Sequence, residues 1–199
     1  IVGDPVLTFA ADHVNRSPVP RTLGLNIGTA DGRIWGSEDR VCEEMAKLAK
    51  TATKAGWSVK WFAVWPKDLE ITRKAASAGG SGHEICPIFR NHRKFMAQVR
   101  SLTAFVGMKL HATILATCAL TPAIMLEYQP KCRDYMKSID REEATFRTDA
   151  FKADEIWDLI CLFNNHHADA SLALSKGIHS LRKKQKEFAS KITASILYY

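Results

Sequence analysis

The sequence has few of the features that mark secreted, membrane-spanning or metal-binding proteins. Its first residues, 1–5, contain no basic stretch followed by a long apolar run, so we expect no secretory signal peptide. Its most apolar stretch, 112–120, is far too short to cross a bilayer. The five cysteines are odd in number, widely scattered and without Cys-x-x-Cys spacing. They predict reduced thiols in a cytoplasmic protein rather than disulfides or a zinc site.

The charge is not balanced, since the 199 residues carry a formal net charge of +7. A basic balance favours an anionic partner, which is nucleic acid, a membrane surface or a phosphorylated substrate. The basic residues are spread out and do not interleave with aromatic residues in a nucleic-acid motif, so we expect no nucleic-acid partner. The motif His166-His167-x-Asp169 lies in a predicted surface helix, and we assign no metal to it.

Apolar runs and helix signals alternate along the middle of the chain. Strands are expected at 22–28, 57–65, 84–89, 103–106 and 123–126, with helices at 37–56, 67–78, 91–101, 110–120 and 132–139. Five β–α units in a row predict an α/β fold, a Rossmann-like parallel sheet with helices on both faces. After residue 148 two helical segments follow, with no further strand. We therefore divide the chain into a linker at 1–20, a Rossmann-like domain at 21–150 and a helical C-terminal tail at 151–199.

Five loops leave the carboxyl ends of the expected strands, where an open parallel sheet binds its ligands. They carry a strongly basic cluster in which Asp68 and Glu127 are the acids. In chain order the residues are Asn26, Gly28, Pro66, Asp68, Arg90, His92, Arg93, Gly107, Lys109, His111, Glu127, Tyr128 and Lys131. Lys109 and His111 stand between a strand and a helix, where an anion would meet both side chains and the N–H groups of the helix end. The loop edge is thus a candidate anion-binding site.

The segment Gly107–Lys131 resembles the signature region of the polysaccharide pyruvyl transferases. That family has a strand ending in Gly, then x-Arg-Leu-His-Ala, an apolar helix, a Pro-started strand and Tyr-x-x-Lys. The matching residues here are Gly107, Leu110, His111, Ala112, Pro122, Tyr128 and Lys131. The stretch 23–28 resembles the opening strand of the same half, and 3–7 resembles the segment that joins the two halves. Lys109 departs from the family's usual Arg, and it offers a point charge instead of a planar fork.

The resemblance implies one half of a glycosyltransferase-B-like fold, the carboxyl-terminal one of two Rossmann-like halves. It also implies transfer of pyruvate from phosphoenolpyruvate to a sugar diol as a cyclic ketal, in glycan or exopolysaccharide biosynthesis. Phosphoenolpyruvate is then the donor substrate, and no cofactor is required. The implied partners are a sugar or lipid-linked glycan acceptor and an amino-terminal half that is missing from this chain.

The resemblance and the loop positions together predict the site. His111 and Glu127 are the expected catalytic residues, and the expected substrate-binding residues are Lys109, Leu110, Lys131, Asn26, Gly28, Asp68 and Arg90. His111 would supply or relay the proton that the enol carbon receives. Lys109 and Lys131 would hold the carboxylate and the leaving phosphate. Glu127 or Asp68 would take a proton from the sugar hydroxyl or orient it.

Two other functions stay open. One is a nucleotide-sugar glycosyltransferase of the same fold, and the other is a non-catalytic module that binds a glycan or phosphate. The tail carries an apolar stripe at Ile178, Leu181, Phe188, Ile192 and Ile196. We expect this stripe to pack on the sheet domain or on the missing half. Contact with the inner face of the cytoplasmic membrane, through the basic flanks of the stripe, is the less favoured alternative.

Overall fold

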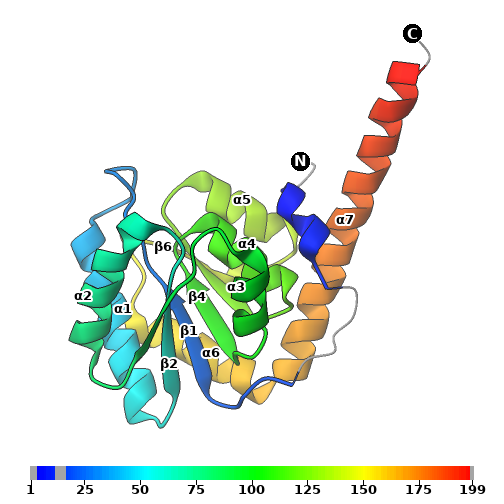
Figure 1. Cartoon of the computed structure of the whole chain (residues 1–199). Coiled ribbons are helices and arrows are strands. Elements are labelled where there is room, and N and C mark those ends of the chain that lie inside the picture. Colours follow the sequence, from blue (N-terminus) through cyan, green and yellow to red (C-terminus); the bar gives the residue numbers. More distant parts are fainter. Residues whose placement is uncertain (1–3, 12–16, 198–199) are drawn as a thin grey trace.

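The computed structural model of the chain describes the backbone of residues 4–11 and 17–197, and side chains up to residue 193. These residues form one sheet of six parallel strands in the order β3-β2-β1-β4-β5-β6 (Figure 1). The strands are β1 Thr22–Asn26, β2 Ser58–Ala63, β3 Glu84–Pro87, β4 Ala104–Gly107, β5 Ala123–Glu127 and β6 Thr145–Arg147. The order reverses between β1 and β4, as in a Rossmann-like sheet, so the predicted α/β fold is confirmed.

The strand β6 extends the sheet beyond the five predicted strands. It pairs with β5 over three residues, with Thr145 opposite Met125 and Arg147 opposite Glu127. Its sequence, Thr-Phe-Arg, is too short to show an alternation of apolar and polar residues. A neighbouring strand therefore recruits this segment, and local sequence preference does not reveal it.

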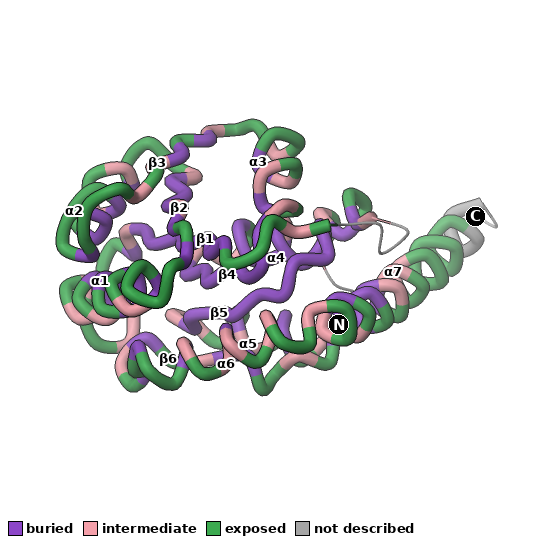
Figure 2. Tube along the Cα trace, turned by 90° about the horizontal axis from the view of Figure 1, so that it is seen from below, coloured by how far each residue is buried: buried purple, intermediate pink, exposed green. Residues whose placement is uncertain are grey.

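Helices cover both faces of the sheet. Their bounds are α1 Glu38–Lys54, α2 Leu69–Gly79, α3 His92–Val99, α4 Leu110–Cys118, α5 Pro130–Ser138, α6 Ala153–Asn165 and α7 His167–Leu197. One apolar cluster joins α1, α2 and α6 to one face of the strands, and two further clusters join α3, α4, α5 and α7 to the other. Figure 2 shows the buried strands between these helices. The sheet is thus fully covered, and its carboxyl edge is left for ligands.

The beginning of the described chain packs against its end. A short 3-10 helix, η1 Pro5–Phe9, buries Leu7 completely against residues of α4 and α7. The side chain of Gln185 on α7 donates a hydrogen bond of 2.9 Å to the carbonyl oxygen of Asp4. The far part of α7 runs beyond the sheet, as Figure 1 shows. The division of the chain at residues 20 and 150 stays a prediction.

The predicted apolar stripe of the tail divides into two parts. Ile178 and Leu181 are buried in the cluster formed with η1, α4 and α5, whereas Phe188 and Ile192 are exposed. The side chain of Ile196 lies outside the described residues. Among the helices that the structure describes, α7 included, none has both the length and the apolarity of a membrane-crossing segment.

Candidate functional site

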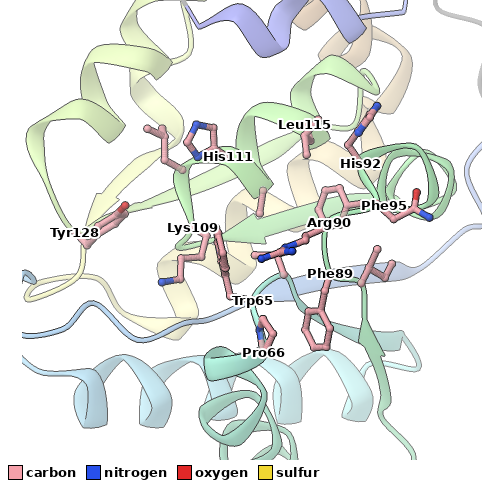
Figure 3. A pocket seen from close by; sticks show the side chains of 15 residues that line it. Trp65, Pro66, Phe89, Arg90, His92, Phe95, Lys109, His111, Leu115 and Tyr128 are labelled. Atoms are coloured by element: carbon pink, nitrogen blue, oxygen red, sulfur yellow. The ribbon is translucent and has the colours of Figure 1, made fainter.

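A pocket of about 500 Å³ opens at the carboxyl edge of the sheet. Loops that follow β2, β3, β4 and β5 form its walls (Figure 3). Its lining is mostly apolar and aromatic, with a few basic side chains; the residues used below are Trp65, Phe89, Arg90, His92, Lys109, Leu110, His111 and Tyr128. This volume and this composition are typical of small-molecule sites.

The first turn of α4 borders this pocket. Lys109 is the N-cap residue, and no side chain caps the helix there. The imidazole of His111 is 70% exposed, and its Nε2 lies 3.5 Å from Oδ2 of Asp4. Leu110 is partly buried and packs against the cluster on this side of the sheet. The helix end therefore presents free N–H groups and an accessible imidazole together, an arrangement suited to an anion.

The ammonium group of Lys109 turns away from solvent toward a buried carboxylate. Its Nζ lies 3.4 Å from Oδ1 of the fully buried Asp68, and it donates a short hydrogen bond to the carbonyl oxygen of Thr29. The same Oδ1 accepts hydrogen bonds from the N–H (3.0 Å) and hydroxyl (3.2 Å) of Thr29. The side chain of Lys109 is only 17% exposed. Most of its charge is therefore directed at the protein itself.

Asn26 and Gly28 complete the support beneath Lys109. The Asn26 amide donates to the carbonyl of Phe62 (2.8 Å) and accepts from the N–H of Lys109 (3.0 Å), so it joins β1, β2 and the loop after β4. A Cβ atom on Gly28 would lie 2.7 Å from Cγ of Asp68 and would also overlap the Lys109 side chain. Three predicted site residues, Asn26, Gly28 and Asp68, thus lie under the pocket and hold Lys109 in place.

Arg90 lines the opposite wall, in the loop between β3 and α3. Its backbone is left-handed, with φ of +54°, which is uncommon for a residue with a side chain. Within the described residues its guanidinium makes no hydrogen bond and no ion pair. Figure 3 shows the guanidinium directed toward the interior of the pocket. Next to it, Nε2 of His92 is buried and finds no hydrogen-bond partner in the described part of the chain.

The other two predicted residues are Glu127, the last residue of β5, and Lys131, in the first turn of α5. Lys131 is exposed, and its Nζ lies 5.3 Å from the ring centroid of Tyr128, which lines the pocket. The side chain of Glu127 is only 4% exposed. Its Oε2 accepts a hydrogen bond of 2.9 Å from Nε of Arg133 of α5 and forms an ion pair with Nη2 of the same side chain, also at 2.9 Å. The Glu127 carboxylate raises the pKa of Arg133. Glu127 does not line the pocket.

Several contacts escape sequence reasoning. Asp4, Thr29 and Arg133 have no recognisable motif of their own, since each acts through a partner distant in the chain or on another element. Trp65 had a usable signal, because it ends the predicted strand 57–65 and therefore falls at the carboxyl edge. No Asp or Glu occurs among the described residues that line the pocket. Nor do three His, Cys, Asp or Glu side chains of the described chain gather as metal ligands would.

Comparisons with known proteins agree with this geometry. A family model described as "Polysaccharide pyruvyl transferase" matches residues 1–130 of the 199. A comparison with curated protein sequences gave no match.

Solved structures resemble the fold at low sequence identity. A glycosyl transferase of family 9 from Veillonella parvula is 14% identical with a TM-score of 0.55, over 74% of this chain and 46% of that one. A candidate UDP-N-acetylglucosamine 2-epimerase from Listeria monocytogenes is 10% identical with a TM-score of 0.55, over 98% of this chain and 49% of that one. The glycotransferase of kitacinnamycin is 11% identical with a TM-score of 0.51, over 94% and 46%. The chain thus has the fold of one half of a glycosyltransferase-B-like protein, and it spans about half the length of these structures.

Proposed function

Because the chain belongs to the polysaccharide pyruvyl transferase family, we propose that it carries the donor site of a transferase that moves pyruvate from phosphoenolpyruvate to a sugar diol as a cyclic ketal. The observation that carries this proposal is the pocket at the carboxyl edge of the sheet. There Arg90, His111 and the uncapped start of α4 meet in an otherwise mostly apolar lining. A small, dense anion needs such a combination of positive charge and exclusion of water.

The donor fits the start of α4. Phosphoenolpyruvate carries a carboxylate and a phosphate on three carbons, so its charges need more than one cationic group. Positive charge comes from the first turns of two helices: the N–H groups and the His111 imidazole of α4, and the ammonium of Lys131 of α5, beside Tyr128. A volume of about 500 Å³ leaves room for part of an acceptor as well.

His111 is the proposed proton donor. Protonation of the methylene carbon of phosphoenolpyruvate gives an oxocarbenium-like centre, which one sugar hydroxyl attacks. The bond from the attacked carbon, C2, to the phosphate oxygen then breaks, inorganic phosphate leaves, and the second hydroxyl attacks C2 to close the ketal. Each hydroxyl gives up one proton: the imidazole that has lost its own takes one, and the other leaves with the phosphate. His111 suits both steps because its ring is accessible at the pocket wall.

Glu127 and Asp68 act in the proposed site through the cations that they hold. Glu127 fixes Arg133, and Asp68 fixes Lys109, so each keeps one side chain of the carboxyl edge in position. Their burial gives them little access to an acceptor hydroxyl. The role of orienting the site therefore agrees better with their contacts than the role of general base.

Trp65 is the proposed contact for the acceptor. It is 54% exposed and lines the pocket. An exposed indole ring suits the apolar face of a pyranose, which leaves the hydroxyls of the sugar free to react. The acceptor in this proposal is a glycan, either free or linked to a lipid carrier.

Calorimetric titration of the chain tests the donor first. Phosphoenolpyruvate, a nucleotide sugar and inorganic phosphate are titrated separately. We expect phosphoenolpyruvate to bind most tightly, and His111→Ala to retain most of this affinity while it abolishes phosphate release in the presence of acceptor. His166→Ala, which removes an exposed histidine far from this pocket, is the matched control. Binding of the nucleotide sugar alone would favour a glycosyltransferase, and binding of phosphoenolpyruvate unaccompanied by turnover would favour a binding module.

A further inference from the structure

We infer that Arg90, and not Lys109, makes the forked contact with the carboxylate of the donor, whereas Lys109 serves to hold the floor of the site together. This inference rests on the proposed function and assigns the residue that recognises one part of the substrate. Lys109 is the N-cap residue of α4, and Arg90 lies in the loop between β3 and α3. On this inference, recognition of the carboxylate and support of the pocket floor belong to residues of two different loops.

Lys109 is already engaged. Of the three donors on its ammonium group, one faces Asp68 Oδ1 at 3.4 Å and one is given to the carbonyl oxygen of Thr29. Asp68 is fully buried, and among the described residues Lys109 is its ion-pair partner. If Lys109 turned toward a ligand, the buried carboxylate of Asp68 would lose its ion-pair partner. The free energy lost in this way exceeds the free energy gained from one contact with a ligand.

The surroundings also keep Lys109 where it is. Gly28 has no side chain, so the stem of Lys109 and the carboxylate of Asp68 can occupy the space beside it. Asn26 fixes the backbone of Lys109 through the hydrogen bond from its N–H. These contacts come from the end of β1, from the loop that follows it and from the segment after β2 that contains Asp68. Lys109 is therefore part of the scaffold on which the pocket stands.

Arg90 has the opposite properties. It lines the pocket, and within the described residues its guanidinium makes neither a hydrogen bond nor an ion pair. Its left-handed backbone, with φ of +54°, is a conformation that side chains disfavour and that is found most often at functional sites. Hydrogen bonds hold the loop on both sides, from the N–H of Ile88 to the Ala63 carbonyl (2.9 Å) and from the N–H of Lys94 to the Asn91 side chain (2.9 Å).

The chemistry of the two cations matches this division. A guanidinium offers two parallel N–H donors to the two oxygens of a carboxylate, whereas an ammonium offers a single point of charge. No Asp or Glu among the described lining residues competes for Arg90. The pocket has no guanidinium at position 109, and the β3–α3 loop supplies one. The α4 N-terminus then remains for the phosphate.

Titration with three probes tests the inference. The probes are phosphoenolpyruvate, pyruvate, which carries the carboxylate alone, and inorganic phosphate, and the variants are Arg90→Lys, Lys109→Arg and Lys109→Met. We expect Arg90→Lys to lower the affinity for phosphoenolpyruvate and for pyruvate by about tenfold or more, because the forked contact is lost. The affinity for phosphate should stay within about twofold of that of the unaltered chain. Arg93→Lys, a neighbouring substitution outside the pocket lining, is the matched control and should change none of the three.

The Lys109 variants separate the two roles. Lys109→Met should lower the midpoint of thermal unfolding, whereas Arg90→Lys should leave it unchanged. Lys109→Arg keeps a charge beside Asp68 and should leave the affinity for phosphoenolpyruvate unchanged within about twofold. The inference is overturned, with the proposed function intact, if phosphoenolpyruvate binds Arg90→Lys as tightly as the unaltered chain, or if Lys109→Arg tightens its binding. If the unaltered chain binds no phosphoenolpyruvate, the proposed function fails and the inference falls with it.

Discussion

His111 and Asp4 meet across the contact between α4 and η1, with Nε2 of the imidazole 3.5 Å from Oδ2 of the carboxylate. The other oxygen of Asp4 accepts a 2.9 Å hydrogen bond from the N–H of Val6 and caps η1. One carboxylate therefore fastens a short helix and fixes the direction of an otherwise exposed ring. Because the contact with Asp4 holds Nε2, the ring presents its other nitrogen, Nδ1, in a defined orientation.

Replacing Asp4 by Asn tests this arrangement. The amide oxygen can still cap η1, but the charge that faces His111 is gone. In the full-length protein we expect turnover to fall by about tenfold, with little change in the KM for phosphoenolpyruvate. This tenfold fall is part of the roughly 100-fold or more that a positioned proton donor contributes to the rate. In a His111→Gln background the same change should have no further effect. Glu70→Gln, which changes an exposed acid on α2, is the control. If Asp4→Asn lowers turnover equally in the two backgrounds, the two residues are not coupled.

Gly28→Ala should destabilise the fold. The added Cβ overlaps the space of Lys109 and lies 2.7 Å from Cγ of Asp68, so a buried ion pair has to shift. We expect the free energy of unfolding in urea to fall by about 2 kcal/mol. Gly82→Ala, where a Cβ meets open space but φ is +82°, should cost about 1 kcal/mol, from backbone strain alone. Equal losses in the two variants would show that the close packing around Gly28 is unimportant.

Arg133→Met should also lower stability, because Glu127 is then left buried without its partner. The expected loss is about 2 kcal/mol, below the usual cost of breaking a buried pair, because the Arg133 side chain is 38% exposed and water screens its charge. A second change, Glu127→Gln, should restore most of the loss. Lys74→Met, which breaks the surface pair with Asp39, is the control and should leave the unfolding curve unchanged.

Alkaline solution should weaken the fold through its buried thiols. Burial raises the pKa of Cys86 and of Cys118 to about 12, from an ordinary value of 9.0. Below about pH 9 the folded and unfolded chains both keep these protons. Between about pH 9 and pH 12 only the unfolded chain loses them, so stability falls as pH rises. The slope should approach about 1.4 kcal/mol per pH unit for each thiol, and urea unfolding at pH 8 and pH 10 measures it. Cys161→Ala should retain most of this slope, since Cys161 is less buried.

Local signals predicted most of the fold. Ser37 accepts a hydrogen bond from the N–H of Arg40 as an N-cap residue, and α1 begins at the next residue, as its sequence indicates. The strand–helix alternation also placed Lys109 and His111 correctly at the carboxyl edge, beside the pocket. Of the strands in the described part of the chain, β6 alone was missed, because a three-residue strand depends on its neighbour for its existence.

The sequence could not predict which side chains at the carboxyl edge face a possible ligand and which face the protein. Lys109 and Glu127 both follow buried strands, and nothing in their local sequence tells whether they face a ligand or the protein. Lys109 turns to Asp68, which lies 41 positions earlier, and Glu127 turns to Arg133 on the next helix. Such choices depend on tertiary contacts and side-chain direction, and periodicity carries no information on either.

The long helix α7 connects its own exposed outer part to the segment around η1. Arg182 and Gln185 reach the carbonyl oxygens of Ala10 and Asp4, at 3.4 and 2.9 Å, and the exposed Phe188 and Ile192 lie farther out along the same rod. Through these contacts α7 is connected to η1, and the carboxylate of Asp4 connects η1 to the ring of His111 at the pocket wall. The outer part of α7 is thus linked to the pocket by a chain of direct contacts, although no described residue of α7 lines the pocket.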